Sequence, residues 1–382
     1  MPASDGKIRI AYLIDTISSD KAGTEKQLLQ LIERIDRDRF LPAVVCLYSS
    51  PFMTRLNQPC ETLSLGYRGF LHPSIILVIC RYLRLLKEHR FDLVQTFFED
   101  AMFLGFFGKL LGGGGQALVV SRRDLGLGAD EPGYHRLFKR LHRFIFRAAD
   151  GVAVNARAIA AWLVASGVAP GKVRLIRNGM SIPAQPAQRP TIFAEHPHDV
   201  WVVMVANLKP IKRVDLFLDA FALAAARFPE GRVGGIVLGE GRLRPELEAR
   251  IAALGLQEVV HLPGAVEKVT DYLHFCDIGV LCSDNEGLSN ALMECMGCGL
   301  PVAVTEVGGN TELVDETNGF VVPAGDRDAL ADALCTMAGD PALRRRLGAA
   351  AKARVEAETG WETVMPQWET YYRQIVERCD HV

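Results

Sequence analysis

The sequence lacks any apolar run long enough to span a lipid bilayer. Its longest runs, such as SIILVIC at 74–80, fall far short of the roughly 20 residues that a transmembrane helix needs. The first residues also lack the basic stretch and the apolar segment that mark a signal peptide. We therefore expect a cytoplasmic protein.

An excess of charge of one sign is lacking as well. The formal net charge is −2, so the overall charge does not favour nucleic-acid binding. With 49% hydrophobic and 23% charged residues in a chain of 382, the composition is that of an ordered protein. Such a chain is long enough for two or three domains.

Metal-binding patterns are scarce. Of the nine cysteines only Cys295 and Cys298 form a CxxC pair, with no second pair and no histidine at ligand spacing. Buried thiols in a reducing compartment are the favoured interpretation, ahead of a redox pair. Two DxD triplets, at 36–38 and 326–328, stand where a turn and a helix N-cap explain them. We expect neither a metal nor a cofactor.

Short apolar runs alternate with helical patterns along most of the chain, which is typical of parallel α/β domains. The first half predicts a helix at 25–35 and strands at 7–14, 41–48, 91–97, 117–121 and 151–155. The second half predicts strands at 200–207, 233–239, 259–264, 278–283, 300–305 and 319–324. This alternation predicts two Rossmann-type domains.

The boundaries come from composition. Residues 180–199 contain four prolines and little periodicity, which indicates a linker. The aromatic-rich, amphipathic segment 361–378 predicts a helix that packs across the junction. We therefore predict a first domain at 1–182, a linker at 183–199, a second domain at 200–360 and a C-terminal crossover helix at 361–382.

Several loops offer groups that could bind phosphate. Parallel sheets bind ligands beyond the carboxyl ends of their strands, where helix N-termini present N–H groups to anions. Gly23 precedes the first helix, and Gly239 ends a strand of the second domain. Arg244 stands where a dinucleotide fingerprint needs its third glycine, so a nicotinamide enzyme is not favoured. The loop LKPIKR at 208–213 has three cations, which suit a diphosphate, although such runs are more often solvated.

Two glutamates, Glu286 and Glu294, flank an apolar run in SDNEGLSNALMECMGCGLPV at 283–302. On one continuous helix an interval of eight residues would turn the second side chain by roughly 80° from the first. We therefore expect Glu286 in a loop and Glu294 within the helix that follows it.

The ordered set of segments resembles the retaining glycosyltransferases of family 4. NEGLSNALMECMGCGLPVAVTEVGGNTELV at 285–314 matches the family's E-x7-E region. Further matching segments are AGTEKQLL (22–29), RLIRNGMSIP (174–183), VANLKPIKRVDLFLDAF (205–221), GEGRLRPELEARI (239–251), LPGAVEKVTDYLHFCDIGVLCS (262–283) and NGFVVPAGD (318–326). The resemblance implies the GT-B fold, with two Rossmann-like domains facing a central cleft and a C-terminal helix that crosses back to the first domain.

The resemblance also implies roles for individual residues. Glu294 would bind the ribose of a nucleotide-diphosphate sugar, Glu286 would lie beside the donor sugar, and Lys212 would contact the diphosphate. These are the residues expected to carry catalysis. The other donor-binding residues would be Gly23 in the first domain, Gly239, the backbone of Gly287, Leu288 and Ser289, and Lys209 or Arg213 in place of an arginine that relatives carry at Asn207.

The implied reaction is transfer of the sugar, with retention and without a metal, to a hydroxyl of a saccharide or lipid-linked acceptor. It would serve cell-surface polysaccharide or glycolipid synthesis, with the leaving phosphate assisting the acceptor hydroxyl. A glycosidase with two catalytic carboxylates is not favoured, because a nucleotide diphosphate leaves without protonation by a carboxylic acid. A sugar-nucleotide epimerase or hydrolase, or a non-catalytic protein of the same fold, is the alternative.

Two features concern the acceptor. Arg122, Arg123 and Asp124 could bind an acidic or phosphorylated acceptor or form a structural ion pair, and we weigh these alternatives equally. The segment YHRLFKRLHRFIFRAAD at 134–150 alternates apolar and basic residues, and its charges are Arg136, Lys139, Arg140, Arg143 and Arg147. Such a helix could lie peripherally on an anionic membrane surface or pack on its own domain, again with equal weight.

Overall fold

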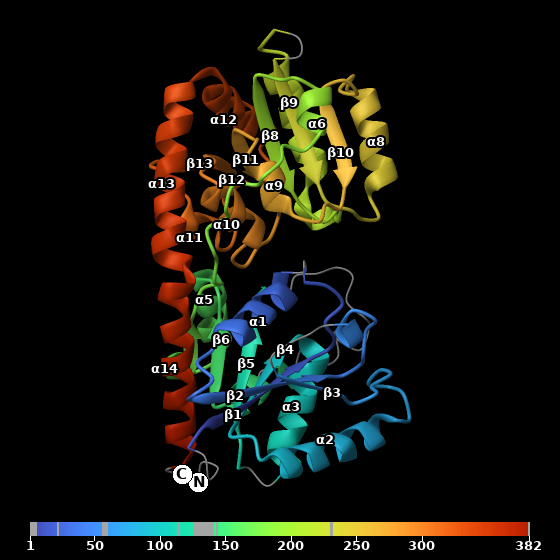
Figure 1. Cartoon of the computed structure of the whole chain (residues 1–382), viewed down its shortest axis with the longest axis vertical. Helices are drawn as coiled ribbons and strands as arrows, with labels where there is room; N and C mark the ends of the chain where they lie inside the picture. Colours follow the sequence, from blue (N-terminus) through green and yellow to red (C-terminus); the bar gives the residue numbers. More distant parts are fainter. Residues whose placement is uncertain are drawn as a thin grey trace. The chain divides into compact units, whose positions relative to one another are not determined.

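The computed structural model describes residues 6–20, 23–55, 60–112, 115–124, 141–142, 144–229 and 232–380. These residues divide into two compact units. Unit 1 combines Met1–Gly179 with Glu362–Val382, and unit 2 is Met180–Trp361. Each unit has its own parallel sheet with helices packed on it (Figure 1). The predicted α/β class and the two Rossmann-like domains are confirmed.

The sheet of unit 1 has seven strands in the order β3-β2-β1-β4-β5-β6-β7. Because β2 and β4 flank β1 in parallel, the strand order reverses there, and sheets of this type bind ligands beyond that point. The strands are β1 (Ile8–Ile14), β2 (Phe40–Cys46), β3 (Glu61–Ser64), β4 (Leu93–Phe97), β5 (Ala117–Arg122), β6 (Gly151–Val154) and β7 (Val173–Leu175). The helices are α1 (Gly23–Arg34), α2 (Ile75–His89), α3 (Glu99–Leu111), α5 (Arg157–Ala165) and α14 (Trp361–Asp380), with short 3-10 turns at Met53–Arg55 and Pro170–Lys172.

Apolar side chains of α2, α3, α5 and residues 145–146 form one core with β1, β2 and the neighbouring strands. The C-terminal helix α14 packs elsewhere on this sheet, where the Tyr372 ring contacts Tyr12 and Phe40 with centroids 6.4 and 6.1 Å away. The buried Tyr372 hydroxyl donates to Gln95 Oε1 at 2.6 Å, and Gln95 Nε2 donates to the Ser121 hydroxyl at 2.7 Å. The predicted return of the C-terminal helix to the first domain is thus confirmed.

The segment expected to be a linker, residues 183–199, belongs to unit 2. It contains the short helix α6 (Ile192–Glu195), whose Phe193 is buried against Trp201 with ring centroids 5.0 Å apart. The boundary between the units falls at Gly179 and Met180 instead. The four prolines of this segment predicted a linker, but the packing of Phe193 on Trp201 attaches the segment to the sheet of unit 2.

The sheet of unit 2 has six parallel strands in the order β10-β9-β8-β11-β12-β13. The strands are β8 (Val200–Val205), β9 (Val233–Leu238), β10 (Val260–Gly264), β11 (Ile278–Leu281), β12 (Val302–Thr305) and β13 (Gly319–Val322). The helices are α7 (Val214–Ala225), α8 (Arg244–Ala253), α9 (Val269–Leu273), α10 (Asn290–Gly297), α11 (Asn310–Leu313), α12 (Arg327–Gly339) and α13 (Pro341–Thr359), and η3 (Pro210–Lys212) is a 3-10 turn. β8 and β11 are adjacent, so their carboxyl ends meet at the reversal of strand order.

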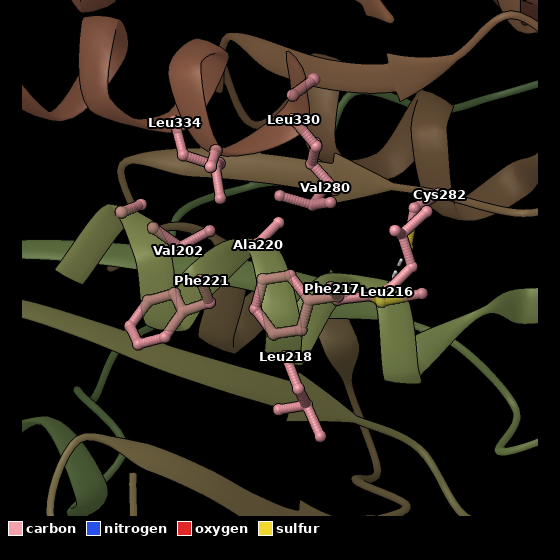
Figure 2. Close-up of a cluster of buried hydrophobic side chains, with 14 of the residues drawn as sticks. Val202, Leu216, Phe217, Leu218, Ala220, Phe221, Val280, Cys282, Leu330 and Leu334 are labelled. Atoms are coloured by element: carbon pink, nitrogen blue, oxygen red, sulfur yellow. Dashed lines mark hydrogen bonds between the residues drawn. The ribbon is translucent and has the colours of Figure 1, made fainter. Parts of the chain in front are cut away.

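The core beneath that edge is close-packed and apolar. Figure 2 shows Phe217 and Phe221 of α7 near Val202 of β8 and Val280 of β11, with Leu330 and Leu334 of α12 on the other side. Phe217 and Phe221 are fully buried. This packing anchors α7, and with it the loop that precedes α7, to the strand whose end carries the candidate site.

Candidate functional site

Lys212 and Glu286 form an ion pair at the carboxyl edge of the unit 2 sheet. Lys212 is the last residue of η3, which follows β8, and Glu286 lies in the loop that follows β11. The Ser283 hydroxyl donates to the same Glu286 oxygen at 2.7 Å. The Glu286 side chain is 11% exposed and that of Lys212 is 24% exposed. An ammonium group has three N–H donors, so Lys212 can hold Glu286 and still reach a second anion.

Two hydrogen bonds tie the η3 turn to the end of β11. The Asp284 N–H donates to the Ile211 carbonyl at 2.9 Å, and the Cys282 thiol donates to the Arg213 carbonyl at 3.0 Å. Arg213 has a left-handed backbone conformation, with φ 50°. The position of Lys212 is therefore set by backbone contacts on both sides of it.

The two cations expected to assist Lys212 differ in their surroundings. The Arg213 guanidinium forms ion pairs with Asp215 and Asp284, each at 3.1 Å. Its hydrogen bonds to Asp215, followed by those to Asp284, raise the pKa of Arg213. Lys209 is exposed and forms no ion pair with any residue that the structure describes. Of the two, Lys209 is thus the more available to a ligand.

The loop after β12 packs against the backbone around Glu286, which the sequence analysis did not predict. Gly308, with φ +50°, packs so closely that a Cβ atom there would lie 1.7 Å from the Glu286 carbonyl oxygen. The Gly309 N–H donates to the Gly287 carbonyl at 3.0 Å. The Thr305 hydroxyl donates to the Ser283 carbonyl at 2.7 Å. The VGG triplet at 307–309 was the available signal, because glycines after a strand indicate a close backbone approach.

Helix α10 begins just beyond this loop. Ser289 is its N-cap, and the Ser289 hydroxyl accepts from the Leu292 N–H at 3.4 Å. Gly287, Leu288 and Ser289 are buried. N–H groups in a first helical turn have no partner within the helix and lie at the positive end of its dipole, which suits phosphate or hydroxyl groups.

Glu294 lies in the middle of α10, whereas Glu286 lies in the preceding loop. This placement agrees with the expectation from their interval of eight residues. Glu294 is partly buried. Lys212, Glu286, residues 287–289 and Glu294 thus belong to one continuous region of unit 2.

Gly239 lies in the neighbouring loop and has a clear structural reason to be glycine. Its φ is +148°, and a Cβ atom there would lie 2.0 Å from the Ala206 carbonyl oxygen. The Gly239 N–H donates to the Gly264 carbonyl at 2.9 Å, and the Leu208 N–H donates to the Glu240 carbonyl at 3.0 Å. The loops after β8, β9 and β10 are therefore packed backbone to backbone, which accounts for Gly239 without a ligand.

Unit 1 holds the remaining predicted residues. Gly23 is exposed and is the first residue of α1. The preceding loop is held by the buried Glu25 carboxylate, which accepts from the N–H groups of Ser18 at 2.8 Å and Ser19 at 2.9 Å. Glu25 thereby fixes the chain that leaves β1, on the carboxyl edge of its sheet.

Arg122, Arg123 and Asp124 lie at the end of β5, and they make structural contacts. Arg122 forms ion pairs with Asp124 at 2.9 Å and with Glu99 at 3.4 Å. Arg123 donates to the Asn178 side chain at 2.6 Å, and its burial lowers the pKa of the guanidinium to about 10. The motif was expected either to bind an acidic acceptor or to form a structural ion pair, and the ion pair between Arg122 and Asp124 is present.

Residues 134–140 and 143 of the basic segment 134–150 lie outside the described residues, and they include Arg136, Lys139, Arg140 and Arg143. In its described part, Ile145 and Phe146 are buried in the unit 1 core. No helix in the described part of the chain is long and apolar enough to cross a membrane.

The described residues include no group of histidine, cysteine, aspartate or glutamate side chains arranged to hold a metal ion. The two DxD triplets have the structural roles that the sequence predicted. Asp326 caps α12 by accepting from the Ala329 N–H at 2.9 Å, and Asp36 accepts from the Asp38 N–H at 2.9 Å in a turn.

Comparison with protein families gives two matches that together span most of the chain. Residues 199–340 match the model described as glycosyl transferases group 1. Residues 22–179 match the model of the glycosyl transferase 4-like domain. The first match contains Lys212, Glu286 and Glu294, and the second contains Gly23 and Arg122.

Curated relatives cover part of the chain. A D-inositol 3-phosphate glycosyltransferase from Kribbella flavida is 28% identical over 61% of this chain and 58% of its own. An enzyme of the same name from Thermobispora bispora is 33% identical over 48% of this chain and 45% of its own. The chain thus spans about half the length of the curated relatives that it matches.

Solved structures match nearly the whole chain. Anabaena HepE, solved in complex with UDP and glucose, gives a TM-score of 0.81 at 22% identity and covers 96% of this chain and 100% of its own. Sucrose-phosphate synthase from Thermosynechococcus elongatus gives 0.79 at 22% identity, over 97% and 100%. At this level of identity the likeness establishes the fold. The chain therefore belongs to the group 1 glycosyl transferases, with a family 4-like N-terminal domain and the GT-B fold.

Proposed function

We propose that the protein is a glycosyltransferase that moves a sugar from a nucleotide-diphosphate donor to a hydroxyl of a saccharide or lipid-linked acceptor. The observation that carries the proposal is the Lys212–Glu286 ion pair at the carboxyl ends of β8 and β11, beside the N-terminus of α10. It combines a fixed cation, a carboxylate and a set of backbone N–H groups. A nucleotide-diphosphate sugar offers matching groups, namely a phosphate, sugar hydroxyls and ribose hydroxyls.

The proposed chemistry follows from charge. As the bond between the anomeric carbon and the diphosphate breaks, positive charge develops on the sugar ring and negative charge on the leaving phosphate. Lys212 and the first turn of α10 stabilise the phosphate, and they need no reorganisation because they are already fixed. Glu286 holds sugar hydroxyls and favours the positive ring electrostatically. Glu294 binds the ribose.

The stereochemical course in the proposal is retention, without a metal ion. The leaving phosphate accepts the proton of the acceptor hydroxyl on the face from which it departs, so the carboxylates need not act as a general acid and a nucleophile. The arrangement of Glu286 supports this course, because its carboxylate is already engaged by Lys212 and Ser283. Product stereochemistry from the anomeric proton signal, measured with and without a chelator, tests both points.

In the proposal, unit 1 binds the acceptor. The reaction serves cell-surface polysaccharide or glycolipid synthesis. A D-inositol 3-phosphate glycosyltransferase and a phosphatidylinositol monomannoside mannosyltransferase are among the relatives by name, which supports a saccharide-like or lipid-linked acceptor. Peripheral contact with a membrane, through the segment 134–150, is part of the same proposal.

A thermal-shift screen against UDP-, GDP- and ADP-sugars tests the donor site. UDP-glucose is the first ligand to try, because HepE was solved in complex with UDP and glucose. We expect one nucleotide class to raise the melting temperature of the wild type and to have little effect on Lys212→Ala. Incubating the labelled donor alone then separates transfer from epimerisation or hydrolysis. Conversion of the donor without any acceptor would overturn the transferase assignment.

A further inference from the structure

Exposed large apolar side chains are unevenly distributed between the two units. Among the described residues, unit 1 carries 12 of the 14 such side chains, and unit 2 carries only Leu254 and Val321. Scattered exposed leucines need no explanation, whereas grouped ones mark interaction sites. The two most exposed members, Leu71 and Ile76, lie at the start of α2, and Leu77 follows Ile76 in the same helix. Leu71 is 79%, Ile76 71% and Leu77 52% exposed.

The exposed side of α2 is apolar at its start and basic toward its end. Its exposed residues are Ile76, Leu77, Cys80, Arg81, Arg84, Lys87 and Glu88. At 100° per residue these positions fall within an arc of about 140° on one side of the helix. The buried residues Val78, Tyr82, Leu85 and Leu86 face the unit 1 core. We call the set Leu71, Ile76, Leu77, Arg81, Arg84 and Lys87 the α2 surface.

The turn before α2 is fixed, so Leu71 is not exposed by chance. Its neighbour Phe70 packs edge-to-face on Phe103 of α3, with ring centroids 5.6 Å apart, and lies 6.1 Å from the Phe107 ring. α2 lies beside α3 in unit 1 (Figure 1). With Phe70 anchored inward, the next residue is held outward, ahead of Ile76 and Leu77.

Two basic residues of α2 have structural partners, since Arg81 donates to the neutral Leu65 carbonyl at 3.3 Å and His89 lies 3.3 Å from Glu61. Cations stabilise a helix C-terminus only within its last turn, and Arg81 and Arg84 lie before that turn. Arg84 and Lys87 form no ion pair with any described residue, and Glu88 is the one carboxylate on this side of the helix. The α2 surface therefore presents positive charge next to apolar side chains.

We propose that the α2 surface docks on an anionic lipid bilayer. Leu71, Ile76 and Leu77 enter the boundary between headgroups and acyl chains, while Arg81, Arg84 and Lys87 contact lipid phosphates. Stable membrane binding takes two signals, and here an apolar and a polybasic one lie on a single helix. The proposal rests on the membrane contact of the proposed function and adds α2 to the segment 134–150 as a second contact, and its test does not depend on glycosyl transfer.

A bilayer fits this surface better than a second copy of the chain. Stable protein interfaces are shape-complementary, with apolar residues flush in a packed patch. Here the apolar side chains project from a helix end, which suits insertion into a fluid phase. Pairing of two α2 surfaces side by side would also bring cations of like sign together, which is unfavourable.

The test is co-sedimentation of the full chain with vesicles of phosphatidylcholine, with or without phosphatidylglycerol, at moderate salt. We expect binding only to the anionic vesicles, weakened as salt rises. The variant Ile76→Ser/Leu77→Ser should lower the partition coefficient at least about tenfold, because two exposed apolar side chains no longer enter the bilayer. Arg84→Gln/Lys87→Gln should remove most of the dependence on anionic lipid.

Matched controls come from unit 2. Leu254→Ser/Val321→Ser removes exposed apolar side chains, and Arg345→Gln/Arg346→Gln removes exposed charges of α13, so neither should alter binding. Cys80 offers a direct readout, because it is exposed, unlike the other eight cysteines. A polarity-sensitive fluorophore on Cys80 should shift to shorter wavelength on anionic vesicles. Melting temperatures of all variants establish that they are folded.

Three outcomes would overturn the proposal. The first is no sedimentation with anionic vesicles at low or moderate salt. The second is binding that Ile76→Ser/Leu77→Ser leaves unchanged while Phe144→Ser abolishes it, which would assign the contact to the segment 134–150 alone. The third is a lipid-free dimer, seen by light scattering, that the α2 variant dissociates. None of these outcomes would change the thermal shift caused by nucleotide sugars, so the donor site is judged separately.

Discussion

The Lys212 ammonium is ion-paired with the Glu286 carboxylate, and Gly308 packs against the backbone carbonyl of the same glutamate. Cation and carboxylate are thus fixed by contacts from three loops, those after β8, β11 and β12. This arrangement places a cation beside a helix N-terminus before any donor arrives, and several predictions about catalysis depend on it.

Replacing Lys212 with alanine is expected to lower kcat by about 10²–10³, with a smaller change in KM, because in the proposed mechanism the cation acts on charge that develops as the diphosphate leaves. Lys212→Arg keeps the charge and should recover part of the rate. Lys209→Ala is the matched control and should affect KM more than kcat. Initial rates with labelled donor measure both parameters. An unchanged kcat in Lys212→Ala would remove this residue from the mechanism.

Gly308→Ala is expected to reduce donor affinity about tenfold, since the new Cβ atom would meet the Glu286 carbonyl oxygen at 1.7 Å and displace it. Gly255→Ala is the control. Its φ is also positive, at +68°, but no atom lies within 4 Å of a Cβ placed there. Both variants should lose stability through backbone strain, and only the first should bind donor weakly in calorimetry. Equal donor affinity in the two variants would contradict the role of Gly308.

Tyr372→Phe is expected to lower the free energy of unfolding by about 1–2 kcal/mol, because the buried Gln95 Oε1 atom loses its donor. Tyr371→Phe is the control, since its buried hydroxyl has no hydrogen-bond partner among the described residues. That change should be neutral or slightly stabilising. Urea unfolding curves of both variants provide the comparison, and equal losses would mean that packing of α14 outweighs the hydrogen bond.

Asp15, at the carboxyl end of β1, makes stability depend on pH. Burial, followed by the negative charge of Asp100, raises its pKa from 3.8 to about 7. The folded state therefore holds this proton more tightly than the unfolded state. The resulting contribution to stability is fully present below pH 3.8 and is lost as pH rises through 7.

Asp15→Asn should remove that loss while its side-chain oxygen still accepts from the Ala101 N–H. We expect the variant to be more stable than the wild type by about 1–3 kcal/mol at pH 8 and equally stable near pH 4. Asp38→Asn, in an exposed turn, should show no such dependence. Urea unfolding at the two pH values measures the difference. A gain of the same size at both pH values would show that ionisation of Asp15 does not destabilise the folded state.

Sequence patterns predicted the central strands well, because buried parallel strands are continuous runs of β-branched and other apolar residues. Two strands of unit 1 were not predicted. β3 is a four-residue edge strand whose side chains are mostly exposed, and β7 has only three residues. Neither length nor hydrophobicity marks such strands. Their pairing depends on the neighbouring strand instead.

The candidate site was predictable in residue type and less so in geometry. Lys212 and Glu286 stood out by charge and position, and the interval to Glu294 correctly separated loop from helix. The sequence could not show that Gly308 packs against Glu286, because this contact arises where loops distant in the chain meet at one sheet edge. Nor could it show that the Ser283 hydroxyl turns toward Glu286 within their shared loop. Gly239 was predicted to bind the donor, but its close backbone packing against Ala206 already explains why this position is a glycine.

The most direct test of the central claim is calorimetric titration of Glu294→Ala with the nucleotide sugar that most stabilises the wild type. If Glu294 holds the ribose as proposed, loss of its carboxylate should weaken binding by about 10- to 100-fold, as expected for charged hydrogen bonds. Glu356→Ala, which changes an exposed glutamate of α13, should bind like the wild type. Wild-type affinity of Glu294→Ala for every nucleotide sugar tested would contradict the account of this site.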